Sequence, residues 1–277
     1  MISKRNTNKN PLRITFVFLL VTGALALLSS ILYESPTLAF IGLGLTFWGA
    51  LFLFLGPARQ IETNLLCNAA APTYSTIDRI IKDFKYTGKA FYIPPYPKGV
   101  YIPEHLKSLK EAVVYVSAEE NTDLPSNEEI AQGKFLLENP KGILIPPPGL
   151  GILTDIEQKS NIDFTNMNII QLCEIVPQII LEKYAIAKEI EMTIEESEIT
   201  IKIKGSAYKK LYAKEANLIS IPLLGCPLAS AVACALTKSS NKVVKITKHE
   251  VSPNDLAIQV TYQIMQDSSQ QNPSALT

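Results

Sequence analysis

The sequence predicts an α+β protein in which an N-terminal transmembrane α-hairpin is followed by a cytoplasmic α+β domain. Two long apolar stretches without a charged residue open the chain, at residues 14–33 and 35–58. After them, apolar residues recur at helix spacing in some segments and alternate as in strands in others. Positive charges gather before the first stretch, and the turn between the two stretches carries none, which indicates that the remaining chain is cytoplasmic.

The two apolar stretches make up a predicted hairpin of membrane-spanning helices at residues 14–56. Residues 14–33 are 20 residues without a charge, and a helix of that length spans ~30 Å, the thickness of a hydrocarbon core. A cleaved signal peptide is the alternative, but a second apolar span follows directly and argues against it.

Within the predicted hairpin, small residues repeat every four positions, at Thr22, Ala26 and Ser30 and at Gly42, Thr46 and Ala50. We expect these stripes to pack the two helices together, with contact between two copies of the hairpin as the alternative.

The charge distribution gives an orientation and excludes one class of partner. Four basic residues lie between positions 4 and 13, so we expect a two-span protein of the cell membrane with both termini, Met1 and Thr277, in the cytoplasm. Removing these four bases and Glu34 from the totals of 26 basic and 26 acidic residues leaves residues 57–277 with a net charge of −3. Nucleic-acid binding needs a clustered basic face, so no nucleic-acid partner is expected.

The change of pattern along the chain divides it into segments. They are a basic cytoplasmic tail at 1–13, the transmembrane hairpin at 14–56, juxtamembrane helices at 57–88, a β-hairpin-rich segment at 89–155, an α+β domain at 162–265 and a disordered polar tail at 266–277. The juxtamembrane helices are expected to break at Pro72. The second of them, Tyr74 to Phe84, is amphipathic. We expect it to pack on the cytoplasmic body, with the membrane surface as the alternative.

A short internal repeat predicts strands in the segment 89–155. Pro97-Lys98-Gly99 and Pro140-Lys141-Gly142 each follow one apolar run and precede another that ends in proline. This pattern predicts strand, tight turn and strand, twice. A further strand is expected at 113–116 and a solvated loop at 119–129. The proline-rich stretches are expected to be structural, with docking to a partner as the alternative.

The segment 162–265 combines helices with antiparallel hairpins. We expect helices at 166–184 (split at Pro177), 208–217 and 227–238, and strands at 191–194, 198–204, 242–251 and 256–264. Pro227 suits the first turn of its helix. In 256–264 apolar and polar residues alternate, which is typical of a half-buried antiparallel strand.

Few residues have a context that suits catalysis or metal binding. His105 and His249 are expected to be structural or solvated. Cys226 and Cys234 lie eight residues apart, with no further Cys or His at metal-ligand spacing. Residues 149–151 lack the Lys and the Ser or Thr of a phosphate-binding loop. We therefore expect no metal and no cofactor, and reduced cysteines as in other cytoplasmic domains.

Cys226 is the one candidate catalytic residue. It lies at the N-terminus of the predicted helix 227–238, where unpaired amides and the helix dipole stabilise a thiolate. The helix that follows is nearly all small and apolar, which indicates that the thiol is buried. A buried thiol is inert, so we expect a structural role, with a reactive thiolate as the alternative.

Two resemblances to known families concern the C-terminal region and the whole chain. The order of helices and hairpins over 166–264, with Gly225-Cys226-Pro227 opening a small-residue helix, resembles the vinyl-reductase-type domain, which has the fold of TRAPP-complex vesicle-tethering subunits. That resemblance implies small hydrophobic ligands and subunit association. Several members carry proposed metal-ligand cysteines near the final hairpin, and this chain has none from Lys242 onward.

The whole chain is also similar to a prokaryotic, largely archaeal family of two-helix membrane proteins without assigned function. The residues that carry this similarity are Gly56-Pro57-Ala58-Arg59, Gly88-Lys89-Ala90, Ile145-Pro146-Pro147-Pro148-Gly149 and Gly225-Cys226-Pro227.

These observations lead to one expected function and two alternatives. We expect a membrane-anchored, non-catalytic cytoplasmic module that binds or assembles a partner protein or an apolar ligand. The alternatives are an accessory subunit of a membrane complex, with the hairpin as its docking element, and a thiol-dependent enzyme that uses Cys226. The expected partners are the lipid bilayer, another protein or a second copy of the chain, and an apolar ligand.

Overall fold

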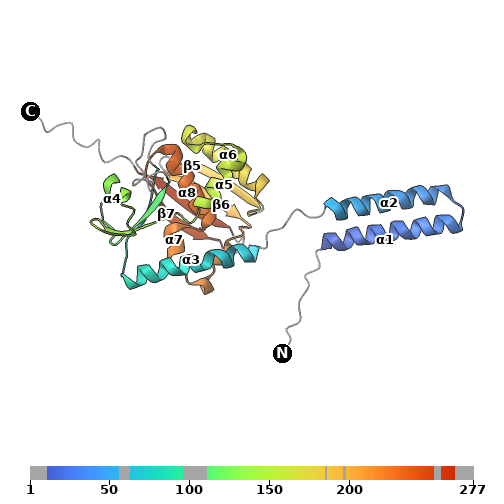
Figure 1. The fold of residues 1–277 in the computed structure, drawn as a ribbon, viewed down its shortest axis with the longest axis horizontal. Coiled ribbons are helices and arrows are strands. Elements are labelled where there is room, and N and C mark those ends of the chain that lie inside the picture. The colour runs from blue at the N-terminus through green and yellow to red at the C-terminus, as the bar shows by residue number, and fades with distance from the viewer. Residues whose placement is uncertain are drawn as a thin grey trace, which may run out of the picture. The chain divides into compact units, whose positions relative to one another are not determined.

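The computed structural model describes residues 11–55, 63–95, 111–184, 186–195, 198–252 and 257–265. The chain divides into two compact units, residues 1–60 and residues 61–277, drawn in Figure 1. It has the predicted α+β character, with a pair of helices in the first unit and an eight-stranded antiparallel sheet with helices in the second. Residues 1–10 of the predicted basic tail, the polar C-terminal tail, the turn at 97–99 and His105 lie outside the described residues, and residues 11–13 belong to the first helix.

The first unit is a pair of helices in close contact, α1 (Pro11–Leu32) and α2 (Pro36–Leu55). Glycines lie where the two backbones meet. A Cβ added to Gly23 would lie 2.6 Å from the amide nitrogen of Thr46, and one added to Gly42 would lie 2.8 Å from that of Leu27. Gly49 is buried in the same contact, whereas Ala50, which the sequence pattern favoured, is exposed. The small residues therefore serve the contact between the two helices.

The outward surface of this helix pair is apolar. Large side chains that are more than half exposed include Phe18, Leu25, Leu28, Ile31, Phe40, Leu43 and Phe47. The apolar stretches whose side chains are described are short, 15 residues at Phe18–Leu32 and 16 at Pro36–Leu51. Exposed apolar residues on both helices favour association with a membrane.

The second unit begins with α3 (Thr63–Asp83), one continuous helix that contains Pro72. Its apolar face, with Tyr74, Ile77 and Ile81, is buried in the main core, so this helix packs on the body of the unit. The predicted break at Pro72 is wrong. A proline inside a helix costs ~3 kcal/mol, and burial of several large side chains on one face offsets that cost. The predicted split at Pro177 is also absent, because α6 (Ile169–Lys183) continues through it and buries the proline.

The strands form a single antiparallel sheet. They are β1 (Ala90–Ile93), β2 (Val113–Ser117), β3 (Leu136–Glu138), β4 (Lys141–Ile145), β5 (Glu189–Glu195), β6 (Glu198–Lys204), β7 (Val244–Val251) and β8 (Ile258–Ile264). Their order is β3-β4-β2-β1-β7-β8-β6-β5. The pairing of β1 with β7, with Tyr92 opposite Val244, joins the segment 89–155 to the segment 162–265. These two segments, which the sequence pattern separates, thus share one sheet.

The two faces of the sheet are covered differently. The main core lies on one face, under α3, α5 (Leu150–Ser160), α6, α7 (Ser220–Leu224) and α8 (Pro227–Ser240). On the other face, Phe91, Ile93 and Tyr115 form a smaller cluster with the short helix α4 (Asn127–Ala131). Because side chains alternate along a strand, Tyr92 enters the main core while its two neighbours enter the smaller cluster.

Some predicted elements differ from those found. Helix α4, with a capping box made by Ser126 and Glu129, begins within the predicted solvated loop at 119–129 and continues to Ala131. The helices α5 and α7 were not predicted. The predicted helix at 208–217 is instead two 3₁₀ turns, η3 (Lys209–Tyr212) and η4 (Lys214–Ala216).

Helix α8 is the centre of the second unit. It packs against β1, β7, β8, α5 and α6 (Figure 1). The stretch Ser220–Ser240, which contains α7 and α8, is long and apolar enough to cross a membrane, but 89% of its apolar window is buried. The stretch is therefore a core element of this unit.

The N-terminus of α5 touches the backbone of α8 at Gly149. A Cβ on Gly149 would lie 2.6 Å from the carbonyl carbon of Ser230, and closer still to the amide nitrogen of Ala231 and the carbonyl oxygen of Pro227. The amide of Gly149 donates to the Ser230 hydroxyl at 2.9 Å. Its φ of −93° is accessible to any residue, so the requirement for glycine comes from the lack of space.

We expect Gly149→Ala to lower the free energy of unfolding by about 1 to 3 kcal/mol, because the added methyl group pushes α5 away from α8. Gly151→Ala is the matched control. Its Cβ would meet nothing within 4 Å, and alanine in a helix is favoured over glycine by up to about 1 kcal/mol. Urea unfolding of the full chain in mild detergent, followed by circular dichroism, measures both. Equal effects of the two substitutions would contradict the contact.

Candidate functional site

The structure places Cys226 at the N-cap of α8, between α7 and α8, with none of its surface exposed. The sequence led us to expect this position and this burial. The thiol thus lies near the positive end of the dipole of a 14-residue helix.

Four tyrosines, which we call the tyrosine clamp, bond to the backbone around Cys226. Tyr92 donates to the carbonyl of Leu224 at 2.5 Å, Tyr74 to that of Gly225 at 2.7 Å and Tyr262 to that of Ala229 at 2.9 Å, and the Cys226 amide donates to the Tyr212 hydroxyl at 2.9 Å. Asp78 accepts from the amides of Ile219 and Ser220 at 2.9 and 2.8 Å. Helix ends leave backbone groups without partners inside the helix. Here side chains from other elements supply those partners.

Burial determines the protonation of the thiols. Burial raises the pKa of Cys226, while the Tyr212 hydroxyl and the amides of Ala229 and Leu228 act in the opposite direction without cancelling the effect. Burial likewise raises the pKa of Cys173 to about 11 and that of Cys234 further. At neutral pH these cysteines are thiols, the form that is a poor nucleophile.

His249 lies on β7 and stacks on the ring of Tyr212, with centroids 4.6 Å apart and an angle of 16° between the planes. Its Nε2 atom is buried and has no hydrogen-bond partner among the residues that the structure describes. Burial lowers the pKa of this imidazole, so the ring is neutral at pH 7. No hydrogen bond joins His249 to Cys226 in the described part of the chain, and the two do not form a thiol–imidazole pair.

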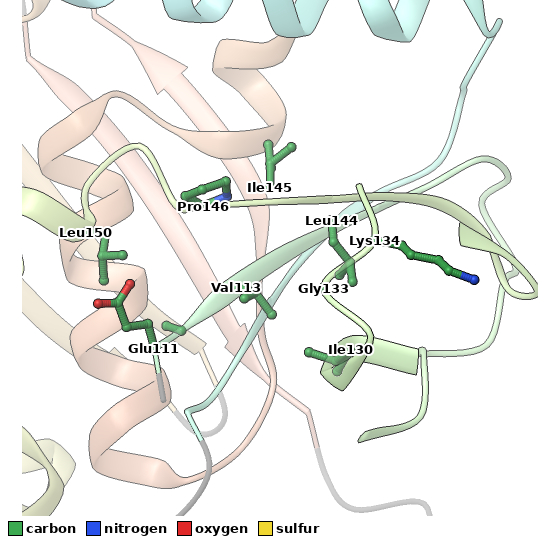
Figure 2. Close-up of a pocket in the computed structure, with 10 residues that line it drawn as sticks. Glu111, Val113, Ile130, Gly133, Lys134, Leu144, Ile145, Pro146 and Leu150 are labelled. Carbon is green, nitrogen blue, oxygen red and sulfur yellow. The ribbon is translucent and has the colours of Figure 1, made fainter. Parts of the chain in front are cut away.

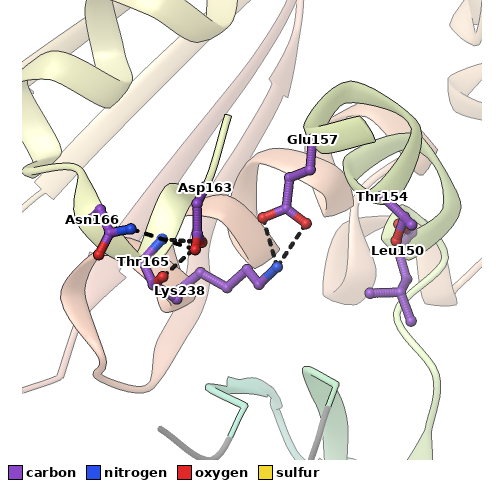
Figure 3. Close-up of polar contacts among 7 residues, drawn as sticks. All are labelled: Leu150, Thr154, Glu157, Asp163, Thr165, Asn166 and Lys238. Carbon is purple, nitrogen blue, oxygen red and sulfur yellow. Dashed lines mark hydrogen bonds and ion pairs between the residues drawn. The ribbon is translucent and has the colours of Figure 1, made fainter. Parts of the chain in front are cut away.

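A polar cluster at the C-terminal end of α8 ties α5 to α8 (Figure 3). Lys238 donates to both carboxylate oxygens of Glu157, at 2.6 and 2.7 Å. The two side chains are only 15% and 18% exposed. Nearby, Asp163 accepts from the amide and the hydroxyl of Thr165. Lys238 and Glu157 carry opposite charges and form an ion pair, which suits a structural tie between helices. Among the described residues, no group of three His, Cys, Asp or Glu side chains could hold a metal ion.

A pocket opens on the side of the sheet that carries α4 (Figure 2). Its volume is about 220 Å³. The apolar part of its wall comes from Val113 on β2, Leu144 on β4, Ile130 on α4 and Leu150 at the start of α5. The pocket is thus an apolar hollow assembled from four elements.

The pocket has no signature of its own in the sequence. Its wall comes from residues up to 39 positions apart, Glu111 to Leu150, and one wall residue, Ile130, lies in a helix that we did not predict. The only local signal was the capping box of Ser126 and Glu129, which marks the start of α4.

The environment of Cys226 leads to a prediction about its reactivity. In the native chain we expect Cys226 to resist iodoacetamide until denaturant is added, because it is buried and protonated. We expect Cys226→Ser to lower the free energy of unfolding by about 1 to 3 kcal/mol, and Cys226→Ala to lower it less, because a polar hydroxyl at this fully buried site costs more than a small apolar side chain. Mass spectrometry of labelled peptides and urea unfolding test the two parts. Rapid native labelling of Cys226 would favour the enzyme alternative.

Comparisons with known proteins add a family. No curated protein and no solved structure matches the chain, and the resemblance to the vinyl-reductase-type domain stays a prediction. A family described as "Domain of unknown function (DUF7982)" matches residues 3–263. This agrees with the expectation of a family without an assigned activity. Because the match covers nearly the whole chain, the chain belongs to the DUF7982 family.

Proposed function

We propose that this protein is a membrane-anchored, non-catalytic binding module. The helix pair anchors it in the bilayer, and the second unit presents its apolar pocket to a partner protein in the cytoplasm. The pocket beside α4 is the observation that carries the proposal, because a concave apolar surface is the usual form of a binding site.

The surface and length of the helix pair support the anchor. Helix α1 has 22 residues and α2 has 20, which corresponds to ~30 Å or more at 1.5 Å per residue. Their outward side chains are apolar. Such helices can lie in lipid, because the backbone N–H and C=O groups in the interior of each helix hydrogen-bond to one another and need no water.

The state of the candidate chemical groups supports a non-catalytic role. The Cys226 thiol is buried and protonated, and His249 is neutral and stacked on a tyrosine. Lys238 and Glu157 neutralise each other. None of these groups faces the pocket, so the pocket suits binding better than bond making or breaking.

The size of the pocket favours a protein partner over a drug-sized ligand. Its volume of about 220 Å³ exceeds the roughly 150 Å³ that holds a benzene molecule. It falls below the roughly 300 to 1,000 Å³ typical of small-molecule sites. A space of this size fits one large apolar side chain, which is how buried anchor residues dominate many protein interfaces.

The predicted topology can be tested by labelling. The four native cysteines are buried, so background labelling is low. On intact cells, we expect a membrane-impermeant maleimide to label Ser35→Cys, in the turn between α1 and α2. Lys209→Cys, exposed in the second unit, is expected to react only after permeabilisation. Labelling of Lys209→Cys on intact cells, or release of the chain from membranes by alkaline carbonate, would contradict the anchored topology.

A further inference from the structure

Two side chains of opposite charge line the pocket beside its apolar wall. Glu111 comes shortly before β2, and Lys134 comes shortly before β3. Figure 2 shows them at opposite ends of the pocket, with Val113, Leu144 and Ile130 between them. Both are exposed, and in the described part of the chain neither has an ion-pair partner. The pocket therefore has an apolar centre, an acidic end and a basic end.

We propose that the pocket recognises an extended segment of a partner protein with one large apolar side chain flanked by charges of opposite sign. The apolar side chain enters between Val113, Ile130 and Leu144. A basic residue of the segment then lies beside Glu111 and an acidic residue beside Lys134. This inference rests on the proposed function, and it adds which apolar and charged side chains the partner segment presents to the pocket.

The geometry of an extended chain gives the spacing of the charges. Alternate side chains of an extended segment point to the same side, and residues two positions apart are ~7 Å apart. The charged residues are therefore expected two positions before and two positions after the anchor. Exposed ion pairs add little affinity but select the orientation of a partner.

Five-residue peptides with a central tryptophan test the proposal. One probe is acetyl-Arg-Gly-Trp-Gly-Glu-amide, the second has Glu at both charged positions, and the third has the first sequence with Ala in place of Trp. The full chain, in lipid nanodiscs to avoid free detergent, carries labelled Ile, Leu and Val methyl groups. We expect the Arg/Glu probe to shift the methyl signals of Val113, Ile130 and Leu144. Its affinity is expected to be weak, with a Kd on the order of 1 mM, and about 3- to 10-fold tighter than that of the Glu/Glu probe, which places a carboxylate beside Glu111 in either direction.

A charge-reversed variant of the protein provides the decisive control. Glu111→Lys makes both ends of the pocket basic and is expected to reverse the preference in favour of the Glu/Glu probe. Because this side chain is exposed, the fold is expected to persist, and unchanged methyl spectra of the free variant check this. Lys209→Glu, an exposed lysine outside the pocket, is expected to leave the preference unchanged.

Several outcomes would overturn the inference. Equal binding of the Arg/Glu and Glu/Glu probes, or a preference that Glu111→Lys does not reverse, would show that the charges do not select the partner. Binding of naphthalene at the same methyl groups without binding of any peptide would indicate a small apolar ligand. No methyl shift with any probe would also overturn it. The cysteine labelling described above tests the membrane anchor independently. The peptide experiment can therefore fail while the proposed membrane anchor stands.

Discussion

The second unit depends on satisfying a helix break inside its core. Gly225-Cys226-Pro227 interrupts two apolar helices at the centre of the fold, and buried backbone groups without partners cost free energy. The tyrosine clamp supplies the partners from α3, β1, η3 and β8, which are far apart in the sequence. These bonds join elements on both sides of the β1–β7 pairing. One local requirement thereby holds together the two halves of the sheet.

The same requirement decides where chemistry can occur. Closing tyrosines around the helix break excludes water from Cys226, so a position that the helix dipole could activate becomes a buried thiol instead. The pocket lies by the opposite face of the sheet, where α4 is the one described helix that packs on the smaller cluster. Away from that cluster the same face is polar, as the contact between the hydroxyls of Thr200 and Thr261 at 3.1 Å illustrates. The main core therefore lies on one face of the sheet, and the accessible apolar pocket lies by the other.

Sequence patterns predicted the elements whose signal is local. The alternating residues of β6 and the proline that opens α8 are where we expected them. The two helix breaks predicted from an internal proline, at Pro72 and Pro177, were wrong, because the packing of α3 and α6 offsets the cost of that proline. The clamp and the pocket could not be predicted. Tyr74 and Gly225 are 151 residues apart, and no local pattern connects them.

A small pocket is sufficient if its partner is held at the same membrane. One apolar anchor in about 220 Å³ gives weak binding on its own, with a Kd on the order of 1 mM. Two proteins confined to one bilayer meet at an effective concentration that can reach the millimolar range when their linkers allow it. Under the function that we propose, the apolar helix pair therefore contributes to binding as well as to location. Weak intrinsic affinity also lets charge at Glu111 and Lys134 decide between partners, because a strong apolar contact would hold any of them.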